Sequence, residues 1–240
     1  MLRTATVLAL ASAAAVVAAP APPPTEKERL AKYWGTTDGG GEFELKGKQL
    51  TVRSTVGKPN HYGWWEEPIA VPRTGRPVKG DFEITVQVLE AATPRKDAKV
   101  DHGAPSTSAG LYIHGANTTL RYYLNQSYDQ FAGGAVGTDL RRWVGLEANF
   151  PNGGASGMMG SVEDGKLPFL RLIRRGKVVT MSNSVDGEKW SEPNNPFANL
   201  DMGIPDELTV GVFVSHSTYQ FGHATFDKFT IEKPKSEKAK

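Results

Sequence analysis

The segment at residues 168–190 constrains the fold most, because apolar and polar side chains alternate along it between two tight turns. In its first half two leucines flank Arg171, and this period of two is typical of a β-strand with one face in a core. Gly176 and the pair Asp186 and Gly187 mark the turns, since glycine adopts a positive φ without steric cost. The segment therefore predicts a β-hairpin followed by the start of a third strand.

The same alternation recurs along the rest of the chain, most clearly at residues 82–88. Turn-forming residues separate many short segments of this kind, and almost no segment has helical periodicity. The pattern predicts an all-β fold, namely a two-sheet antiparallel sandwich of the jelly-roll type. Strands are expected at residues 42–45, 49–54, 68–71, 81–89, 109–114, 121–125, 142–150, 169–174, 177–184, 208–215 and 222–232, with long loops at 91–108, 151–166 and 191–205.

The first residues, 1–21, have the pattern of a secretory signal peptide. A basic Arg3 precedes an apolar stretch and small residues, and cleavage is expected between Ala18 and Ala21. The apolar stretch is too short to predict a membrane span, and no second long one follows it. We therefore expect a protein that is secreted or located in the periplasm or cell envelope, with no stable membrane span after cleavage. Because an exported chain without cysteine has no disulfide framework, a bacterial protein fits better than an animal ectodomain.

The remaining chain is expected to form one domain. Residues 22–41 are interpreted as a leader or linker, in which the stretch from Thr25 to Trp34 forms one or two helical turns. The jelly-roll domain is expected at residues 42–232, because roughly 220 residues suffice for one all-β domain with a full core. Residues 233–240 are expected to be a disordered basic tail.

Composition argues against several classes of site. The formal net charge is +2, and Arg3 and the basic tail account for it, so the body of the chain lacks the basic patch that nucleic-acid binding requires. The sequence contains no cysteine, so disulfides, thiolate metal sites and cysteine nucleophiles are excluded. Its five histidines have no metal-type spacing, and no metal site is predicted from them.

Six sequence blocks occur in an order that is seen in a known superfamily. In that order they resemble a family of bacterial secreted domains, of largely unassigned function, within the concanavalin A-like lectin and glucanase superfamily. The blocks lie at residues 80–88, 108–113, 169–176, 184–190, 208–214 and 224–231.

The resemblance implies a sandwich of two antiparallel sheets, one of them curved, with a concave face that holds sugar in lectin and glucanase relatives. It also makes calcium a candidate cofactor, because folds of this type often carry one ion near the chain ends. Asp38 and Asp227 are then conceivable ligands, although neither lies in a recognisable calcium loop.

The most aromatic and ionisable cluster of the chain contains Trp64, Trp65, Glu66 and Glu67. Indole rings stack on the apolar faces of pyranoses while adjacent carboxylates accept hydrogen bonds from sugar hydroxyls, so the cluster is a candidate carbohydrate platform. The alternative is that one tryptophan belongs to the core and the other covers a sheet edge.

A second candidate site follows from the strand alternation, which places a polar and aromatic set on the face opposite to the core. Such a set suits hydrogen bonding to hydroxyl-rich or acidic ligands. Ordinary solvent-facing residues of a sandwich are the alternative explanation. The set contains Tyr112, His114, Arg121, Tyr123 and Asn125, joined by Arg171 if its strand lies in the same sheet.

Glycoside hydrolases on this fold use two carboxylates that project from one strand face and flank the scissile bond. The sequence has no such pair, since Glu147 stands alone in its expected strand and the neighbours Glu66 and Glu67 would point to opposite faces. No catalytic residue is predicted.

The turn at residues 184–190 is interpreted as structural. The Asp186 carboxylate can accept hydrogen bonds from turn amides, Gly187 takes the positive φ, and Trp190 packs the hairpin onto the sheet. The block is also similar to the Asp-box hairpin of sialidases, although it lacks the spacer residue between the aspartate and the glycine.

These observations together predict a secreted non-catalytic binding module, with carbohydrate or envelope polysaccharide as its ligand by family analogy. Two alternatives stay open at this stage. One is a glycoside hydrolase-type enzyme on the same fold, and the other is a structural or interaction protein of the cell envelope.

Overall fold

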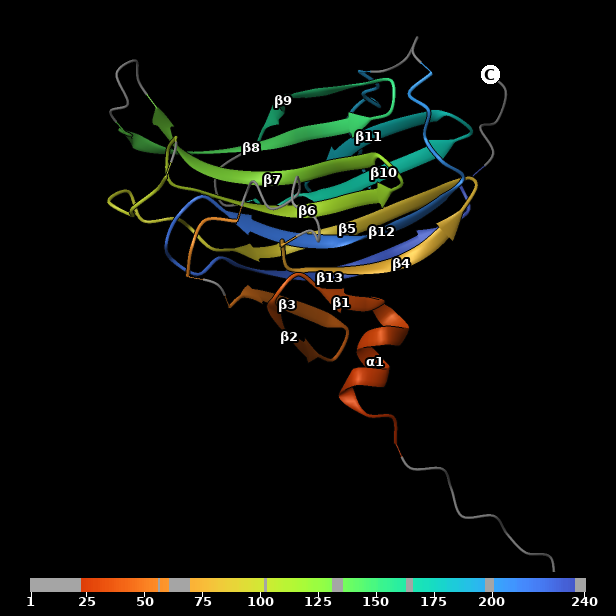
Figure 1. Cartoon of the computed structure of the whole chain (residues 1–240), viewed down its shortest axis with the longest axis horizontal. Coiled ribbons are helices and arrows are strands. Elements are labelled where there is room, and N and C mark those ends of the chain that lie inside the picture. The colour runs from red at the N-terminus through yellow and green to blue at the C-terminus, as the bar shows by residue number, and fades with distance from the viewer. Residues whose placement is uncertain are drawn as a thin grey trace, which may run out of the picture.

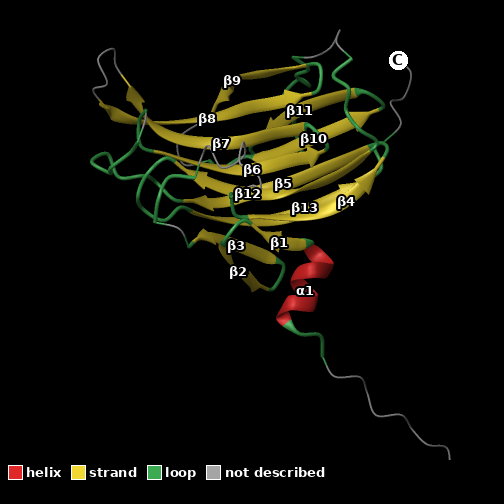
Figure 2. Ribbon diagram, in the orientation of Figure 1, coloured by secondary structure: helices red, strands yellow, loops and turns green. Residues whose placement is uncertain are grey.

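The computed structural model describes residues 23–55, 57–60, 70–101, 103–130, 136–162, 166–196 and 201–235. It has two antiparallel β-sheets that pack face to face, and one short helix lies at the N-terminal end of the described chain (Figure 1; Figure 2). The predicted all-β, two-sheet sandwich is therefore confirmed.

One sheet has seven strands and the other has six. All paired neighbours in both sheets are antiparallel. The seven-stranded sheet has the order β1 (Thr36–Asp38), β4 (Arg73–Lys79), β12 (Glu207–His216), β6 (Ser106–Gly115), β7 (Thr118–Gln130), β8 (Val136–Phe150) and β9 (Gly153–Ser161). The six-stranded sheet has the order β11 (Val178–Ser184), β10 (Phe169–Arg175), β5 (Phe82–Ala91), β13 (His223–Glu232), β3 (Gln49–Ser54) and β2 (Gly41–Lys46).

The main core lies between the two sheets, where the inward-facing residues of each strand meet. Along β5 the side chains alternate between buried and half-buried, as the period of two predicts. Facing them are buried apolar residues of β6, β7 and β12, and this contact fixes which side of the seven-stranded sheet points away from the core. The main core includes Phe82, Ile84, Val86, Val88, Leu111, Ile113, Tyr122, Leu124, Val210 and Val212.

Three strands differ from the prediction. β1 lies within the segment expected to be a leader, and the other two differences concern residues 151–166 and 68–71. The expected loop at 151–166 contains β9, an edge strand whose residues, mainly glycine, serine and methionine, are mostly exposed. Only Ala155 and Met159 of β9 pack, half-buried, against the main core, so the strand shows no hydrophobic alternation. The strand expected at 68–71 is β4 instead, beginning at Arg73, and the described residues 70 and 71 are not in a strand.

The segment expected to be a leader, residues 22–41, contributes to the sandwich. Thr25 and Glu28 cap α1 (Glu26–Tyr33) reciprocally in a capping box. Trp34 follows the helix, is only 1 % exposed and belongs to the main core. Its ring stacks on Phe229 at 5.1 Å between centroids, and its Nε1 donates a hydrogen bond to the Lys48 carbonyl at 3.1 Å.

The predicted signal peptide at residues 1–21 and the end of the basic tail at 236–240 lie outside the described residues. In the described part of the chain, no helix has the length and apolar character needed to cross a membrane.

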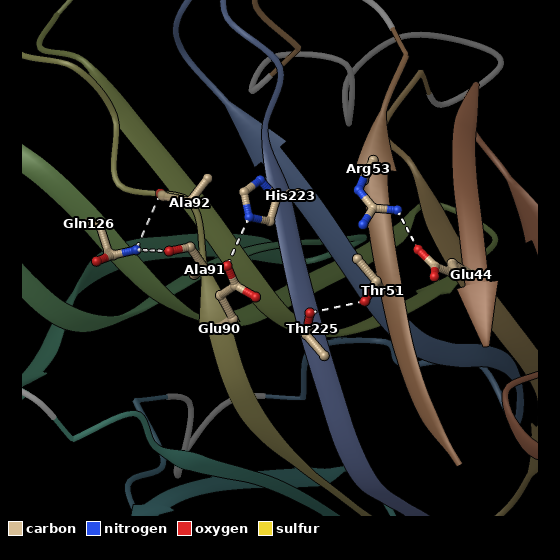
Figure 3. Close-up of polar contacts among 9 residues, drawn as sticks. All are labelled: Glu44, Thr51, Arg53, Glu90, Ala91, Ala92, Gln126, His223 and Thr225. Carbon is tan, nitrogen blue, oxygen red and sulfur yellow. Dashed lines mark hydrogen bonds and ion pairs between the residues drawn. The ribbon is translucent and has the colours of Figure 1, made fainter. Parts of the chain in front are cut away.

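The outer face of the six-stranded sheet carries polar side chains that pair with one another (Figure 3). Arg53 forms an ion pair with Glu44 at 2.8 Å, and His223 Nε2 lies 3.2 Å from Glu90 Oε1. Between these pairs the hydroxyls of Thr51 and Thr225 are 3.0 Å apart. These cross-strand contacts tie β2, β3, β13 and β5 together.

Candidate functional site

A groove of about 380 Å³ lies on the face of the seven-stranded sheet that points away from the core. It crosses β12, β6, β7 and β8, and its volume lies within the range of small-ligand sites. The described lining residues are Gly103, Ala104, Ser106, Ser108, Arg121, Tyr123, Asn125, Ser127, Tyr128, Trp143, Glu147, Ser215 and Ser217.

The strand register arranges this face in three neighbouring rows, because residues paired across antiparallel strands share a face. Each row runs from β12 through β6 and β7 to β8. The polar row is Ser215, Ser108, Asn125 and Trp143; the aromatic row is Phe213, Gly110, Tyr123 and Gly145; the charged row is Gly211, Tyr112, Arg121 and Glu147.

Two glycines of the aromatic row make room for the rings beside them. A Cβ at Gly110 would lie 2.9 Å from Tyr123 Cβ, and a Cβ at Gly145 would lie 2.3 Å from Trp143 Cζ3. The Tyr123 ring contacts Trp143 and Phe213 with centroid distances of 6.1 and 6.0 Å. The half-buried Trp143 therefore lies over β8 at the edge of a small apolar cluster.

Several hydroxyl groups lie in the polar row or line the groove beside it, and two of them, those of Ser108 and Ser217, already form hydrogen bonds within the protein. Ser108 Oγ donates to Asn125 Oδ1 at 2.7 Å. Ser217 Oγ accepts from the Ser106 N–H at 2.8 Å and donates to the Ala104 carbonyl at 2.9 Å. Ser215 differs, because its Oγ is buried without a hydrogen-bond partner among the described residues, although the side chain lines the groove.

In the charged row, Arg121 and Glu147 face each other across β7 and β8 and form an ion pair. Arg121 is 4 % exposed, and its guanidinium lies 5.7 Å from the Tyr123 ring centroid and 5.9 Å from that of Phe213. Burial lowers the pKa of Arg121 to about 10, so the guanidinium stays charged at neutral pH. Burial also raises the pKa of Tyr123, whose phenol therefore stays protonated.

The structure places the predicted outward set on one face, but only part of it lines the groove. Arg121, Tyr123 and Asn125 are lining residues. Tyr112 is 2 % exposed and packs with Phe213 in the small apolar cluster, so it is covered rather than solvent-facing. His114 lies at the end of β6, where its Nδ1 is 3.3 Å from the Thr119 hydroxyl, and it is not among the lining residues.

Arg171 does not join this set, because β10 belongs to the six-stranded sheet. There its guanidinium lies 4.0 Å from the Trp190 ring centroid, its Nε donates to Ser182 Oγ at 2.9 Å, and Glu83 is 3.8 Å away. These contacts place Arg171 on the opposite side of the sandwich from the groove.

The other predicted platform, Trp64, Trp65, Glu66 and Glu67, lies outside the described residues. Sequence reasoning missed Trp143 and the serines of the polar row as site residues. A signal for Trp143 exists, because the alternation along β8 puts it on the same face as Gly145 and Glu147.

At the turn after β11, Asp186 Oδ1 accepts hydrogen bonds from the backbone N–H groups of Glu188 and Lys189, both at 2.8 Å, and from the Ser184 hydroxyl at 2.9 Å. These bonds lower the pKa of Asp186 to about 2. Gly187 has a φ of +80°. Trp190 contacts the Phe169 ring edge to face, with the centroids 6.5 Å apart. All these contacts are internal to the hairpin and its sheet.

The two conceivable calcium ligands lie in different sheets. Asp38 forms an ion pair with Arg73 on β4, whereas Asp227 on β13 accepts from Gln49 Nε2 at 3.2 Å and from the Lys228 N–H at 2.7 Å. Their donor atoms are therefore held by protein groups, and a role for calcium stays a prediction.

A second hollow of about 310 Å³ lies at one end of the outer face of the six-stranded sheet. Arg53 and His223 line it and are paired with Glu44 and Glu90, as Figure 3 shows. Phe221 is the large apolar side chain there and is 63 % exposed. None of its described lining residues carries a buried polar atom that lacks a hydrogen-bond partner, as Ser215 does in the first groove, so this hollow is the weaker candidate for ligand binding.

No family model and no curated protein matches the sequence. Solved structures do match the fold. A protein of unknown function from Saccharomyces cerevisiae is 13 % identical, with a TM-score of 0.54, over 82 % of this chain and 98 % of that one.

Weaker likenesses include an alginate lyase from Klebsiella pneumoniae, with 9 % identity, a TM-score of 0.48 and coverage of 80 % of this chain and 84 % of that one. Another is a CBM2 module of Lactobacillus casei phage J-1 evolved Dit, with 9 % identity, a TM-score of 0.42 and coverage of 78 % of both chains. At such low identity a likeness bears on the fold and not on activity. The chain therefore has a two-sheet antiparallel jelly-roll fold.

Proposed function

We propose that this protein is a secreted, non-catalytic carbohydrate-binding module and that the groove on the seven-stranded sheet is its binding site. One observation carries the proposal: a half-buried indole, Trp143, shares a row with hydroxyl and amide groups, one of which, Ser215 Oγ, is buried without a partner among the described residues.

The chemistry of this row fits a sugar. A pyranose has an apolar face that packs on an aromatic ring and an equatorial rim of hydroxyls that both donate and accept hydrogen bonds. Trp143 supplies the ring, while Asn125 and Ser215 supply polar atoms along the same row. A ligand hydroxyl that reached Ser215 Oγ would recover a hydrogen bond whose absence costs about 1–3 kcal/mol.

The lining argues against hydrolysis. Glu147 is the one carboxylate among the described lining residues, and it is engaged by Arg121. Retaining and inverting glycosidases canonically need two carboxyl groups that flank the bond. Tyr123 is held protonated by burial and is therefore a poor general base.

A glycan screen on the protein without residues 1–21 tests the proposal, with the Trp143→Ala variant as the comparison. Trp190→Ala is the matched control, because it removes an indole from the opposite side of the sandwich. We expect binding of at least one glycan, a loss of about tenfold or more in Trp143→Ala, and little change in Trp190→Ala.

Products must be analysed in the same experiment. Release of new reducing ends by the wild type would replace the proposal with the glycoside hydrolase alternative. Absence of binding to every glycan, with the protein folded by circular dichroism, would leave the structural or interaction role in the cell envelope as the better explanation. Repeating the screen with a chelator tests whether calcium is needed.

A further inference from the structure

We propose that the groove selects uncharged glycans and discriminates against uronate-containing or sulfated chains, and that Glu147 is the residue that sets this preference. The inference rests on the proposed function and adds the substrate class. It follows from how the charged row is built and from the lack of other charges in the described lining.

An arginine on a binding face ordinarily recognises anions, because its planar guanidinium forms paired hydrogen bonds with a carboxylate or sulfate. Here a carboxylate of the protein itself, that of Glu147, occupies the position that such an anion would take. Arg121 and Glu147 are direct register partners on β7 and β8, and Arg121 Nη2 donates to Glu147 Oε2. The cation of the groove therefore already has its counter-ion.

The Arg121 guanidinium is also fixed in position by aromatic neighbours and by burial. Its guanidinium lies near the rings of Tyr123 and Phe213, and only 4 % of the residue is exposed. The Glu147 side chain, in contrast, is 30 % exposed. An acidic sugar entering the groove would thus meet the carboxylate of Glu147 before it reached the buried guanidinium, and like charges at short range in a partly desolvated site repel.

The other described lining residues carry no charge. They offer hydroxyl, amide, aromatic and backbone groups, which are suited to hydroxyl recognition: Gly103, Ala104, Ser106, Ser108, Tyr123, Asn125, Ser127, Tyr128, Trp143, Ser215 and Ser217. The described lining as a whole is neutral, with one positive and one negative side chain. Binding of a neutral glycan there should depend little on ionic strength.

Isothermal titration with defined oligosaccharides tests the inference. Neutral probes are xylohexaose, cellohexaose and mannohexaose, and acidic probes are hexagalacturonate and hexamannuronate, each at low and high salt. We expect the best neutral probe to bind about tenfold or more tightly than the best acidic one, with an affinity that salt leaves nearly unchanged. Tighter binding of an acidic probe by the wild type would overturn the inference while leaving carbohydrate binding intact. Binding of neither set, nor of any glycan in the screen, would overturn the proposed function itself.

The Glu147→Gln variant tests the assigned residue. It frees the charge of Arg121 without changing the size of the side chain, and we expect affinity for hexagalacturonate to rise about tenfold. Glu83→Gln is the matched control, because it removes a carboxylate that lies near an arginine, Arg171, on the opposite side of the sandwich. An equal change in both variants, or none in Glu147→Gln, would show that Glu147 does not set the preference. If Glu147→Gln fails to fold, the comparison of probes on the wild type still decides the substrate class.

Discussion

The indole of Trp143 lies directly over Gly145, its neighbour two residues along β8 on the same face. A Cβ added at Gly145 would come within 2.3 Å of Trp143 Cζ3 and within 3.0 Å of the Tyr123 ring. The absence of a side chain at Gly145 thus determines where the indole of Trp143, the proposed sugar-stacking ring, lies. Because Gly145 is the register partner of Tyr123, one glycine positions both rings.

A methyl group at Gly145 should therefore displace the indole of Trp143. We expect Gly145→Ala to displace Trp143, to weaken glycan binding about tenfold, and to destabilise the fold by about 1–3 kcal/mol through overpacking. Gly157→Ala on β9 is the matched control, since a Cβ there meets nothing within 4 Å. Tryptophan fluorescence, titration with the ligand and urea unfolding measure the effects. Identical stability and ligand affinity of the two variants would contradict the claim that Gly145 positions the Trp143 ring.

Ser215 and Ser217 allow the binding role of a hydroxyl to be separated from a structural one. Removing the unpartnered Oγ of Ser215 should raise the free energy of unfolding by about 1 kcal/mol or leave it unchanged, yet weaken ligand binding. Removing the Oγ of Ser217 breaks two hydrogen bonds and should cost about 1–2 kcal/mol. Urea unfolding and titration of Ser215→Ala and Ser217→Ala check both. A Ser215→Ala variant that is destabilised but binds normally would remove Ser215 from the site.

Most of the strands could be predicted from the sequence because alternation depends on a single fact, namely which side chains face a core. The prediction from alternation failed for strands that do not have one face fully on the core. β9 is exposed along most of its length, and the two apolar residues that it packs against the core, Ala155 and Met159, do not make an alternating pattern. β4 contains Gly75 and Pro77, residues that usually argue against a strand. Pro77 is tolerated because β1 pairs only with Arg73, Thr74 and Gly75, which leaves Pro77 at an edge.

The site was less predictable than the fold because it depends on register between strands. Alternation alone placed Arg121, Tyr123 and Asn125 on one face, but the partner of Arg121 is Glu147, 26 residues later. That pairing follows from the connection of β7 to β8 and from an irregularity between Tyr128 and Gln130. A one-residue slip would have put Glu147 on the core face. Only the folded sheet shows that the charge of Arg121 is paired with that of Glu147.

The segment around Trp34 should be required for stability, although it precedes the expected domain boundary. We expect Trp34→Ala to lower the free energy of unfolding by about 3–5 kcal/mol, because it empties a fully buried site against Phe229. Tyr33→Ala is the control; this neighbouring aromatic residue is 36 % exposed and is not part of the core, so the cost should stay within about 1 kcal/mol. Urea unfolding compares the two. Equal and small costs would mean that this segment is a detachable leader after all.

The turn after β11 should confer stability that depends on pH. The folded-state pKa of Asp186 is lowered to about 2 by the hydrogen bonds it accepts, whereas an unfolded aspartate titrates at about 3.9. A depressed folded pKa stabilises the fold above the unfolded pKa, and the contribution is lost as the pH falls through the folded pKa.

We therefore expect Asp186→Ala to lower the Tm by a constant amount above about pH 5, and the difference from the wild type to shrink as the pH falls from about 4 towards 2. Glu188→Ala, which removes an exposed neighbouring carboxylate, should show no such narrowing. Thermal unfolding monitored by circular dichroism across this pH range measures both. A difference that stays constant down to pH 2 would mean that Asp186 stabilises the turn without its charge, since a neutral carboxyl would then serve equally well.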